Sequence, residues 1–164
     1  MTSKYTIKDL ERLSGIKAHT IRIWEQRYQL LNPDRTDSNI RLYNDQELKI
    51  LLNISLLIRH GGKISHLVKL NQEEIHKRIQ DMVQQPTSVN QFFEAQTDSL
   101  VIAMLELDDA RFEKVISTSS IKYGFEQTML NILIPFLQKV GIMWRTGEAN
   151  VFQEHVITNV IRKK

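Results

Sequence analysis

Apolar side chains recur at helical spacing near the start of the chain and predict two short helices joined by a tight turn. Ile7, Leu10 and Leu13 share one face of the first helix, which Thr6 can cap through its hydroxyl group. Gly15 can adopt the left-handed conformation that commonly ends a helix, so the chain is expected to turn there. A second helix is predicted to run from about residue 17 to residue 28.

This second helix has an apolar side and a polar, basic side. Ile21, Trp24 and Tyr28 would face the core. The outward positions are His19, Thr20, Arg22, Gln26 and Arg27. A short loop rich in Pro, Asp and Asn comes next, in the layout of a wing. In a helix-turn-helix the second helix enters the major groove of DNA. An isolated basic helix more often only carries solvated charge, but the turn before it and the loop after it favour DNA binding.

Capping residues mark the helices after the wing. A helix capped by Asn44 or Asp45 and a short helix after it lead to Asn71 and Glu74, which have the spacing of a capping box. A polar stretch with a proline, residues 84–88, is the best linker candidate. We therefore predict a DNA-binding domain over 1–83, a linker over 84–89 and a second domain over 90–164.

The second domain is predicted to be a bundle of four helices. Its third helix is the clearest, because apolar residues recur along it at helical period. They are Phe125, Met129, Ile132, Leu133, Phe136, Leu137 and Val140. Pro135 lies inside this helix and should kink it or cost about 3 kcal/mol of helix stability. The last helix would begin near Glu148. The expected fold class is all-α with a small wing, a winged helix-turn-helix followed by a helical bundle.

Charge is shared unevenly between the two parts of the chain. Residues 1–70 hold 12 Lys/Arg and 7 Asp/Glu, a net of +5, whereas residues 71–164 hold 10 and 12, a net of −2, which together give the overall +3. A basic first part suits a DNA-contacting module. The chain has no cysteine, which excludes disulfides and thiolate metal ligands. No signal segment or run long enough to span a bilayer is found, so a cytoplasmic, soluble protein is expected.

Several motifs in residues 5–43 resemble the DNA-binding domain of MerR-type transcriptional regulators. In order they are Tyr5-Thr6-Ile7, Leu13-Ser14-Gly15-Ile16, Thr20-Ile21-Arg22-Ile23-Trp24-Glu25, Arg27-Tyr28, Leu31 and Arg41-Leu42-Tyr43. The resemblance implies that Thr20, Arg22 and Arg27 act on the recognition helix, and that the wing residues contact mostly phosphates. The full set of predicted DNA-binding residues is His19, Thr20, Arg22, Arg27, Tyr28, Arg35, Asn39, Arg41 and Tyr43.

Two positions depart from the pattern of this family. Many relatives have Gly where Asn39 stands, but Asn tolerates the left-handed conformation better than most residues, so the wing turn should survive. Trp24 replaces a tyrosine that is common in metal-sensing members, and it is expected to anchor the core. The long dimerisation helix of many members is missing or cut short, because the helix from residue 72 runs into the predicted linker.

A second set of residues resembles the helical cap that precedes the cobalamin-binding domain in light-sensing MerR-type repressors and in cobalamin-dependent methyltransferases. It includes Asp109, Phe112-Glu113, Tyr123-Gly124-Phe125, Pro135, Val140-Gly141, Trp144 and Glu154-His155. The resemblance implies that Trp144, Glu154 and His155 lie over the upper face of the corrin. A flat aromatic ring, an acceptor and an imidazole can bury and hydrogen-bond an adenosyl group. The alternative is that His155 and Trp144 only pack in the core.

The Asp-x-His-x-x-Gly motif of the cobalamin-binding domain does not occur in the chain. We therefore expect the C-terminal domain to be absent here, with no cofactor held by this chain and adenosylcobalamin bound only in a longer protein. The interpretation is a DNA-binding transcriptional regulator, a repressor, that acts as a homodimer or higher homo-oligomer on double-stranded operator DNA. It would not be an enzyme. Two alternatives stay open: a bundle that only dimerises the regulator, or the cap fragment of a corrinoid methyltransferase.

Overall fold

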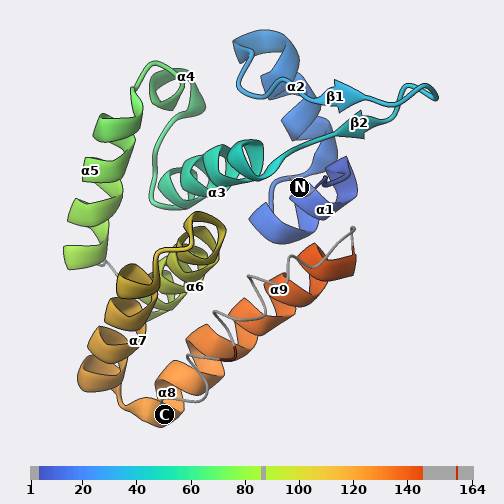
Figure 1. The fold of residues 1–164 in the computed structure, drawn as a ribbon. Helices are drawn as coiled ribbons and strands as arrows, with labels where there is room; N and C mark the ends of the chain where they lie inside the picture. Colours follow the sequence, from blue (N-terminus) through green and yellow to red (C-terminus); the bar gives the residue numbers. More distant parts are fainter. Residues whose placement is uncertain (1–3, 86–87, 146–157, 159–164) are drawn as a thin grey trace. The chain divides into compact units, whose positions relative to one another are not determined.

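The computed structural model describes residues 4–85, 88–145 and 158, and it divides the chain into two compact units. The first unit is Thr2–Pro86 and the second begins at Thr87. Both units are helical, and a two-stranded sheet is the only sheet among the described residues (Figure 1). The predicted fold class, all-α with a small wing, is confirmed.

The first unit opens with the predicted pair of helices. Helix α1, Ile7–Ser14, begins at a capping box in which the Thr6 hydroxyl accepts from the backbone N–H of Asp9 and the Asp9 carboxylate accepts in return. It ends at Gly15, whose φ of 75° is left-handed. Helix α2, Ala18–Tyr28, comes directly after this turn. Thr6 and Gly15 thus act as the sequence predicts.

The wing is a short antiparallel hairpin. Strand β1, Asp34–Arg35, pairs with β2, Arg41–Leu42, and the hairpin projects beside α2 (Figure 1). Asn39 has a φ of 62°, so it adopts the left-handed conformation that we expect at the turn of the wing. Tyr5 and Tyr43 exchange backbone hydrogen bonds of 2.8 and 2.9 Å, which tie the start of the chain to the end of the wing.

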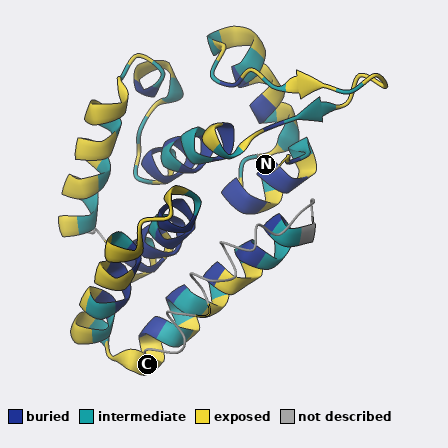
Figure 2. Cartoon of the chain, in the orientation of Figure 1, coloured by how far each residue is buried: buried dark blue, intermediate teal, exposed yellow. Residues whose placement is uncertain are grey.

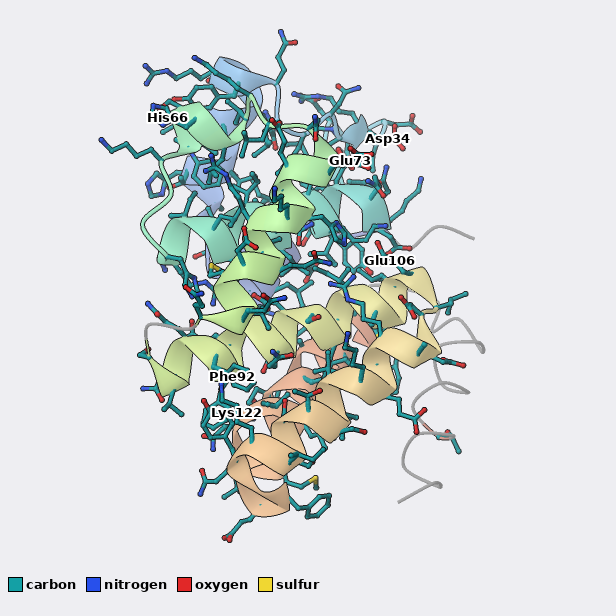
Figure 3. The ribbon with its side chains drawn as sticks, turned by 90° about the vertical axis from the view of Figure 1, so that its left-hand side faces the viewer. Asp34, His66, Glu73, Phe92, Glu106 and Lys122 are labelled. Carbon is teal, nitrogen blue, oxygen red and sulfur yellow. The ribbon has the colours of Figure 1, made fainter. Side chains whose placement is uncertain are left out.

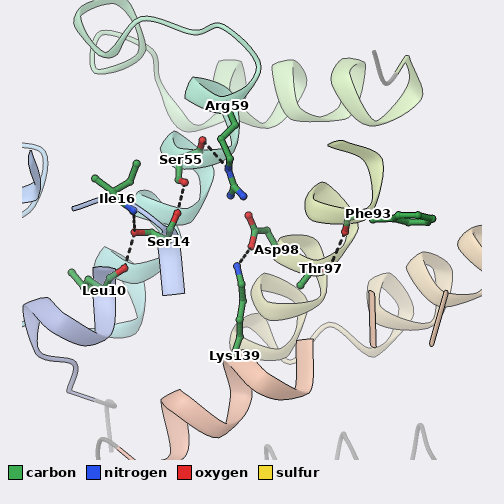
Figure 4. A network of polar contacts seen from close by, with 9 residues as sticks. All are labelled: Leu10, Ser14, Ile16, Ser55, Arg59, Phe93, Thr97, Asp98 and Lys139. Carbon is green, nitrogen blue, oxygen red and sulfur yellow. Dashed lines mark hydrogen bonds and ion pairs between the residues drawn. The ribbon is translucent and has the colours of Figure 1, made fainter. Parts of the chain in front are cut away.

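Three helices complete the first unit. Helix α3, Asp45–Arg59, is capped by Asn44, and its Leu side chains form the centre of the core. The Ser55 hydroxyl of α3 donates to the backbone oxygen of Ser14 at 2.6 Å, which fixes α3 against the turn after α1 (Figure 4). Two shorter helices come after it, α4 over Ile64–Leu67 and α5 over Gln72–Gln84.

The second unit is built from helices that pack around a shared apolar core. Helix α6, Val89–Glu106, has most of its residues buried, and α7, Asp109–Tyr123, packs along it (Figure 2). Next come α8, Phe125–Thr128, a π-helical turn η1, Met129–Leu133, and α9, Ile134–Arg145. The fourth predicted helix, from about residue 148, lies outside the described residues except for Thr158, which is helical.

One buried ion pair crosses this core. The Lys139 ammonium group on α9 binds the carboxylate of Asp98 on α6, and Asp98 is 1% exposed (Figure 4). At the surface of the unit the Lys122 ammonium group lies 4.8 Å from the ring centre of Phe92, a cation–π contact (Figure 3).

The predicted apolar stripe of the third bundle helix is partly wrong. Ile132, Phe136 and Val140 are buried, but Phe125 and Leu137 are 57% and 42% exposed. The prediction assumed one continuous α-helix through Pro135. The structure instead has a π-helical turn before the proline, which adds a residue to the turn and rotates the residues after it, Leu137 among them, relative to those before it. Phe125 lies before this turn, at the first position of α8. The proline lacks the N–H group that a continuous α-helix would use at this point, and the π-helical turn directly before it is a common form of such a break.

Candidate nucleic-acid interface

The outward face of α2 is the centre of the candidate interface. Ile21 and Trp24 are buried at 0% and 8% exposure and hold the helix against the core. The opposite side carries the polar and basic positions predicted from sequence. Of these, His19, Arg22 and Arg27 are exposed, and Thr20 is half-buried. The Arg27 guanidinium carbon lies 5.5 Å from the ring centre of Tyr28, so these two residues stack on each other.

The start of α2 is capped from α1 and not from within its own sequence. Lys17, at the N-cap position, makes no side-chain cap bond. Instead, the carboxylate of Glu11 accepts from the backbone N–H of Ala18 at 3.1 Å and pairs with the Lys17 ammonium group at 3.2 Å. The backbone hydrogen bond from Ala18, followed by the bond from Lys17, lowers the pKa of Glu11 below its ordinary value of 4.5. Glu11 therefore satisfies an N–H group at the end of the helix that would meet DNA.

The wing turn is held by its own side chains. The Thr36 hydroxyl accepts from the backbone N–H of Ile40 at 3.0 Å, and the Arg35 guanidinium donates to the Asn39 side-chain oxygen at 2.6 Å. Arg35 and Asn39 are both exposed. Arg35 thus keeps a charged group at the surface of the hairpin while it fixes the turn.

Two of the predicted DNA contacts bind a carboxylate of the protein. Arg41 Nε donates to Glu25 Oε2 at 2.9 Å, and the Tyr43 hydroxyl donates to the other oxygen of Glu25. Tyr43 is 0% exposed, because its ring packs inside the unit. Burial, and then the bond to Glu25, raise the pKa of Tyr43 above its ordinary value. The side chain predicted to contact phosphates therefore lies in the interior, and Tyr43 is a core anchor of the wing.

Two residues of this arrangement, Glu11 and Glu25, were not predicted from the sequence. Each lies inside a predicted helix where a carboxylate is unremarkable. Their partners come from another element, and nothing in local spacing indicates that Glu25 meets Arg41, 16 residues further on. The signals in the sequence are that Glu11 stands shortly before the predicted turn and that Glu25 belongs to the MerR-type motif of the recognition helix.

The predicted cofactor residues are described only in part. Trp144 lies in the last turn of α9, and its indole N–H is buried without a hydrogen-bond acceptor among the described residues. Glu154 and His155 lie outside the described residues. Within the described part of the chain, no group of three or more His, Asp and Glu residues could hold a metal ion. The described helices also contain no stretch with the length and hydropathy of a membrane span.

Comparison with known proteins agrees with the geometry of the first unit. Residues 5–74 match the family described as MerR HTH family regulatory protein. These residues form a MerR-type helix-turn-helix domain. The match spans the elements from α1 to α4 and so includes α2 and the wing, which carry the candidate interface. Residues 96–164 match a second family, described as B12 binding domain. The MerR-type domain is thus followed by a helical domain of the B12-binding type.

The relatives that this chain matches are named transcriptional regulators. It is 27% identical over 162 residues to the HTH-type transcriptional repressor CarH of Myxococcus xanthus, covering 98% of this chain and 54% of CarH. It is 21% identical to CarA of the same organism, covering 96% of this chain and 50% of CarA. Escherichia coli MlrA, a transcriptional regulator, is 37% identical over 70 residues, 43% of this chain and 29% of MlrA. The chain spans about half the length of CarH and CarA. These names support the prediction that it is not an enzyme.

Proposed function

We propose that this protein is a sequence-specific DNA-binding repressor of transcription. One observation carries the proposal: the exposed basic face of α2 lies beside a hairpin wing that Glu25 fixes to the same helix. A helix of this kind fits the major groove, with side chains at base edges and phosphates. The relatives CarH and CarA are named repressors, which supports the same sign of regulation here.

The proposed contacts match the exposure of the side chains. His19, Thr20, Arg22 and Arg27 would face the groove from α2. Arg35 and Asn39 would lie at the wing, where the Arg35 guanidinium is exposed. Arg41 would hold a phosphate with the guanidinium nitrogens that Glu25 does not engage. Tyr43 would contribute to DNA binding indirectly, because it holds the wing in place. Tyr28 would contribute by stacking against the Arg27 guanidinium group.

A gel-shift assay tests this function. The chain should bind the DNA upstream of its own coding region more tightly than a shuffled duplex of the same length and composition. Binding should also weaken steeply with salt, because phosphate contacts release counterions. The control is a protein with Arg22→Ala and Arg27→Ala, which should lose binding while it keeps its fold, since both residues are exposed. Equal affinity for the native and shuffled duplexes would reject sequence-specific recognition.

We further propose that the helical unit covers a corrinoid such as adenosylcobalamin in a longer form of the protein. The match of residues 96–164 to a B12-binding family supports this proposal. The buried indole N–H of Trp144 also fits, because it is a donor that lacks a protein acceptor in the described structure and a polar ligand could provide one. Trp144, Glu154 and His155 would cover the ligand, and the cofactor would supply its own light or ligand chemistry.

Absorption spectroscopy tests the corrinoid proposal on the longer protein. Protein that includes the C-terminal domain should retain adenosylcobalamin through gel filtration, with a corrin spectrum that co-elutes. Trp144→Phe, which keeps an aromatic ring and removes the N–H group, should weaken retention. If the longer protein elutes without chromophore in both light and dark, the helical unit does not serve a corrinoid.

The unit also has an exposed apolar line along η1 and α9 that favours self-association. Leu130, Ile134 and Leu137 are 53%, 40% and 42% exposed and succeed one another at spacings of four and three residues. A homodimer or higher homo-oligomer on a repeated operator is therefore part of the proposal. Light scattering should give a mass above that of one chain, and Leu137→Glu should lower it. A bundle that associates but shows no response to corrinoid would favour the simpler role of a dimerisation module.

A further inference from the structure

An apolar side chain stands among the polar residues of the recognition helix. Ile23 is 49% exposed, although isoleucine is among the residues most often buried in folded proteins. The residues on either side of it in the sequence behave as expected, since Arg22 is exposed and Trp24 is buried. The Ile23 side chain is thus not used by the core of the unit and is available for a contact outside the protein.

Helical geometry places Ile23 in the middle of the face that would meet DNA. Each residue of an α-helix turns by about 100°, so Ile23 lies about 160° from Ile21, which is 0% exposed. On the same count His19 and Arg27 lie about 40° to either side of Ile23. Ile23 is thus flanked by two exposed polar residues and points away from the core.

We infer that Ile23 reads thymine by contact with its C5-methyl group in the major groove. This inference rests on the proposed DNA-binding function and specifies how one base is chosen. Thymine is the base that presents a methyl group on the floor of the major groove, and apolar side chains are the usual partners of that methyl group. An isoleucine at the centre of the reading face has the matching chemistry.

The other bases are disfavoured at this position for a physical reason. Cytosine and adenine present amino donors in the major groove, and guanine presents acceptors. An isoleucine side chain removes water from such groups without replacing their hydrogen bonds, and this costs free energy at every base, including at O4 of thymine. Only at thymine does contact with a methyl group offset this cost, so the apolar contact is what would select the base.

Uracil provides the test, because it has the hydrogen-bonding groups of thymine without the methyl group. The bound sequence is first selected from random duplexes with the whole chain, and each thymine is then replaced singly by uracil. One position in each half-site should lose affinity by about fourfold, which corresponds to about 0.8 kcal/mol for one buried methyl-sized group. With Ile23→Ala the same replacement should change affinity by less than about 1.5-fold.

A matched control is Ile121→Ala. Ile121 is also an exposed isoleucine on a helix, at 87% exposure, but it lies on α7 in the other unit. This variant should keep the full sensitivity to uracil, about fourfold. If no thymine is sensitive, or if Ile23→Ala leaves the sensitivity unchanged, the inference is wrong while the selected sequence still upholds the proposed function. If no sequence is selected at all, the proposed function fails and the inference with it.

Discussion

Glu25 on the recognition helix forms an ion pair with Arg41 on the wing, with 2.9 Å between Oε2 and Nε. The Glu25 side chain is 8% exposed and that of Arg41 is 24% exposed, so water screens the pair only in part. The second oxygen of Glu25 accepts from the hydroxyl of the buried Tyr43. The Glu25 carboxylate therefore fixes the wing to the recognition helix.

Glu25→Ala should lower the free energy of unfolding by about 2–3 kcal/mol, because it leaves a buried hydroxyl and a half-buried guanidinium without their acceptor. Glu25→Gln should cost less, since it keeps an oxygen that can accept from Tyr43. Urea unfolding of the whole chain measures both. Gln26→Ala, on the exposed face of the same helix, is the matched control and should stay within about 0.5 kcal/mol of wild type.

A double-mutant cycle separates the ion pair from other effects of these substitutions. Combined with Arg41→Ala, Glu25→Ala should cost less than the sum of the two single changes, because the pair can be lost only once. Strict additivity would show that the two side chains do not stabilise each other in solution.

Local spacing explains why much of the fold could be predicted from the sequence. The caps at Thr6, Asn44 and Asn71 each bond to a residue three positions later, so the pattern is visible in the chain itself. Gly15 and Asn39 likewise indicate the positions of turns, because few other residues adopt a positive φ. These five positions set the helix boundaries and the wing of the first unit.

Contacts between different helices and strands could not be predicted from local spacing in the sequence. Glu25 bonds to residues 16 and 18 positions away, and Glu11 caps a helix to which it does not belong. The same limit explains why Tyr43 was predicted at a phosphate and lies in the core. In the second unit, the π-helical turn before Pro135 changes which apolar residues face inward, and a pattern that assumes 3.6 residues per turn cannot show it.

Because of the Tyr43 hydroxyl, the free energy of unfolding should depend on pH in the alkaline range. Its pKa is raised above the ordinary value of 10.0 by burial and by the bond to Glu25, so the folded state keeps the proton to higher pH than the unfolded state does. The resulting stability is fully present below about pH 10 and is lost as the pH rises further. Tyr43→Phe should flatten this loss and cost about 1 kcal/mol near neutral pH. Urea unfolding at several values between about pH 8 and pH 11 compares the two proteins; identical slopes would contradict the assignment.

Gly15 and Gly141 should respond to alanine with opposite signs. Gly15 has a φ of 75°, and nothing lies within 4 Å of an added Cβ, so alanine there meets only backbone strain, about 1 kcal/mol. Gly141 lies inside α9, and an added Cβ has open space, so alanine should stabilise the helix by about 0.5–1 kcal/mol. Urea unfolding of both variants checks the signs. Stabilisation by Gly15→Ala would mean that the turn between α1 and α2 is not left-handed in solution.

Lys139→Met should destabilise the helical unit. It leaves the carboxylate of Asp98, which is 1% exposed, without the ammonium group that binds it. Breaking a fully buried pair costs about 3–5 kcal/mol, and about 2 kcal/mol is expected here because the Lys139 side chain is 20% exposed. Lys122→Met, on the surface of the same unit, is the control and should cost about 1 kcal/mol at most through its contact with Phe92. Thermal unfolding followed by circular dichroism distinguishes the two, and equal losses would contradict a buried charge at Asp98.

Arg22→Ala should weaken binding to the selected operator by about 1–3 kcal/mol if the guanidinium reads a base edge. In that case the loss should be small on a shuffled duplex, and the preference at one base pair should relax. If Arg22 instead holds a phosphate, the loss should be similar on every duplex, and the slope of log affinity against log salt should fall by about 1. Lys122→Ala, from the other unit, should change neither quantity. Binding titrations at several salt concentrations decide between the two roles, and an Arg22→Ala protein that binds like wild type would remove Arg22 from the interface.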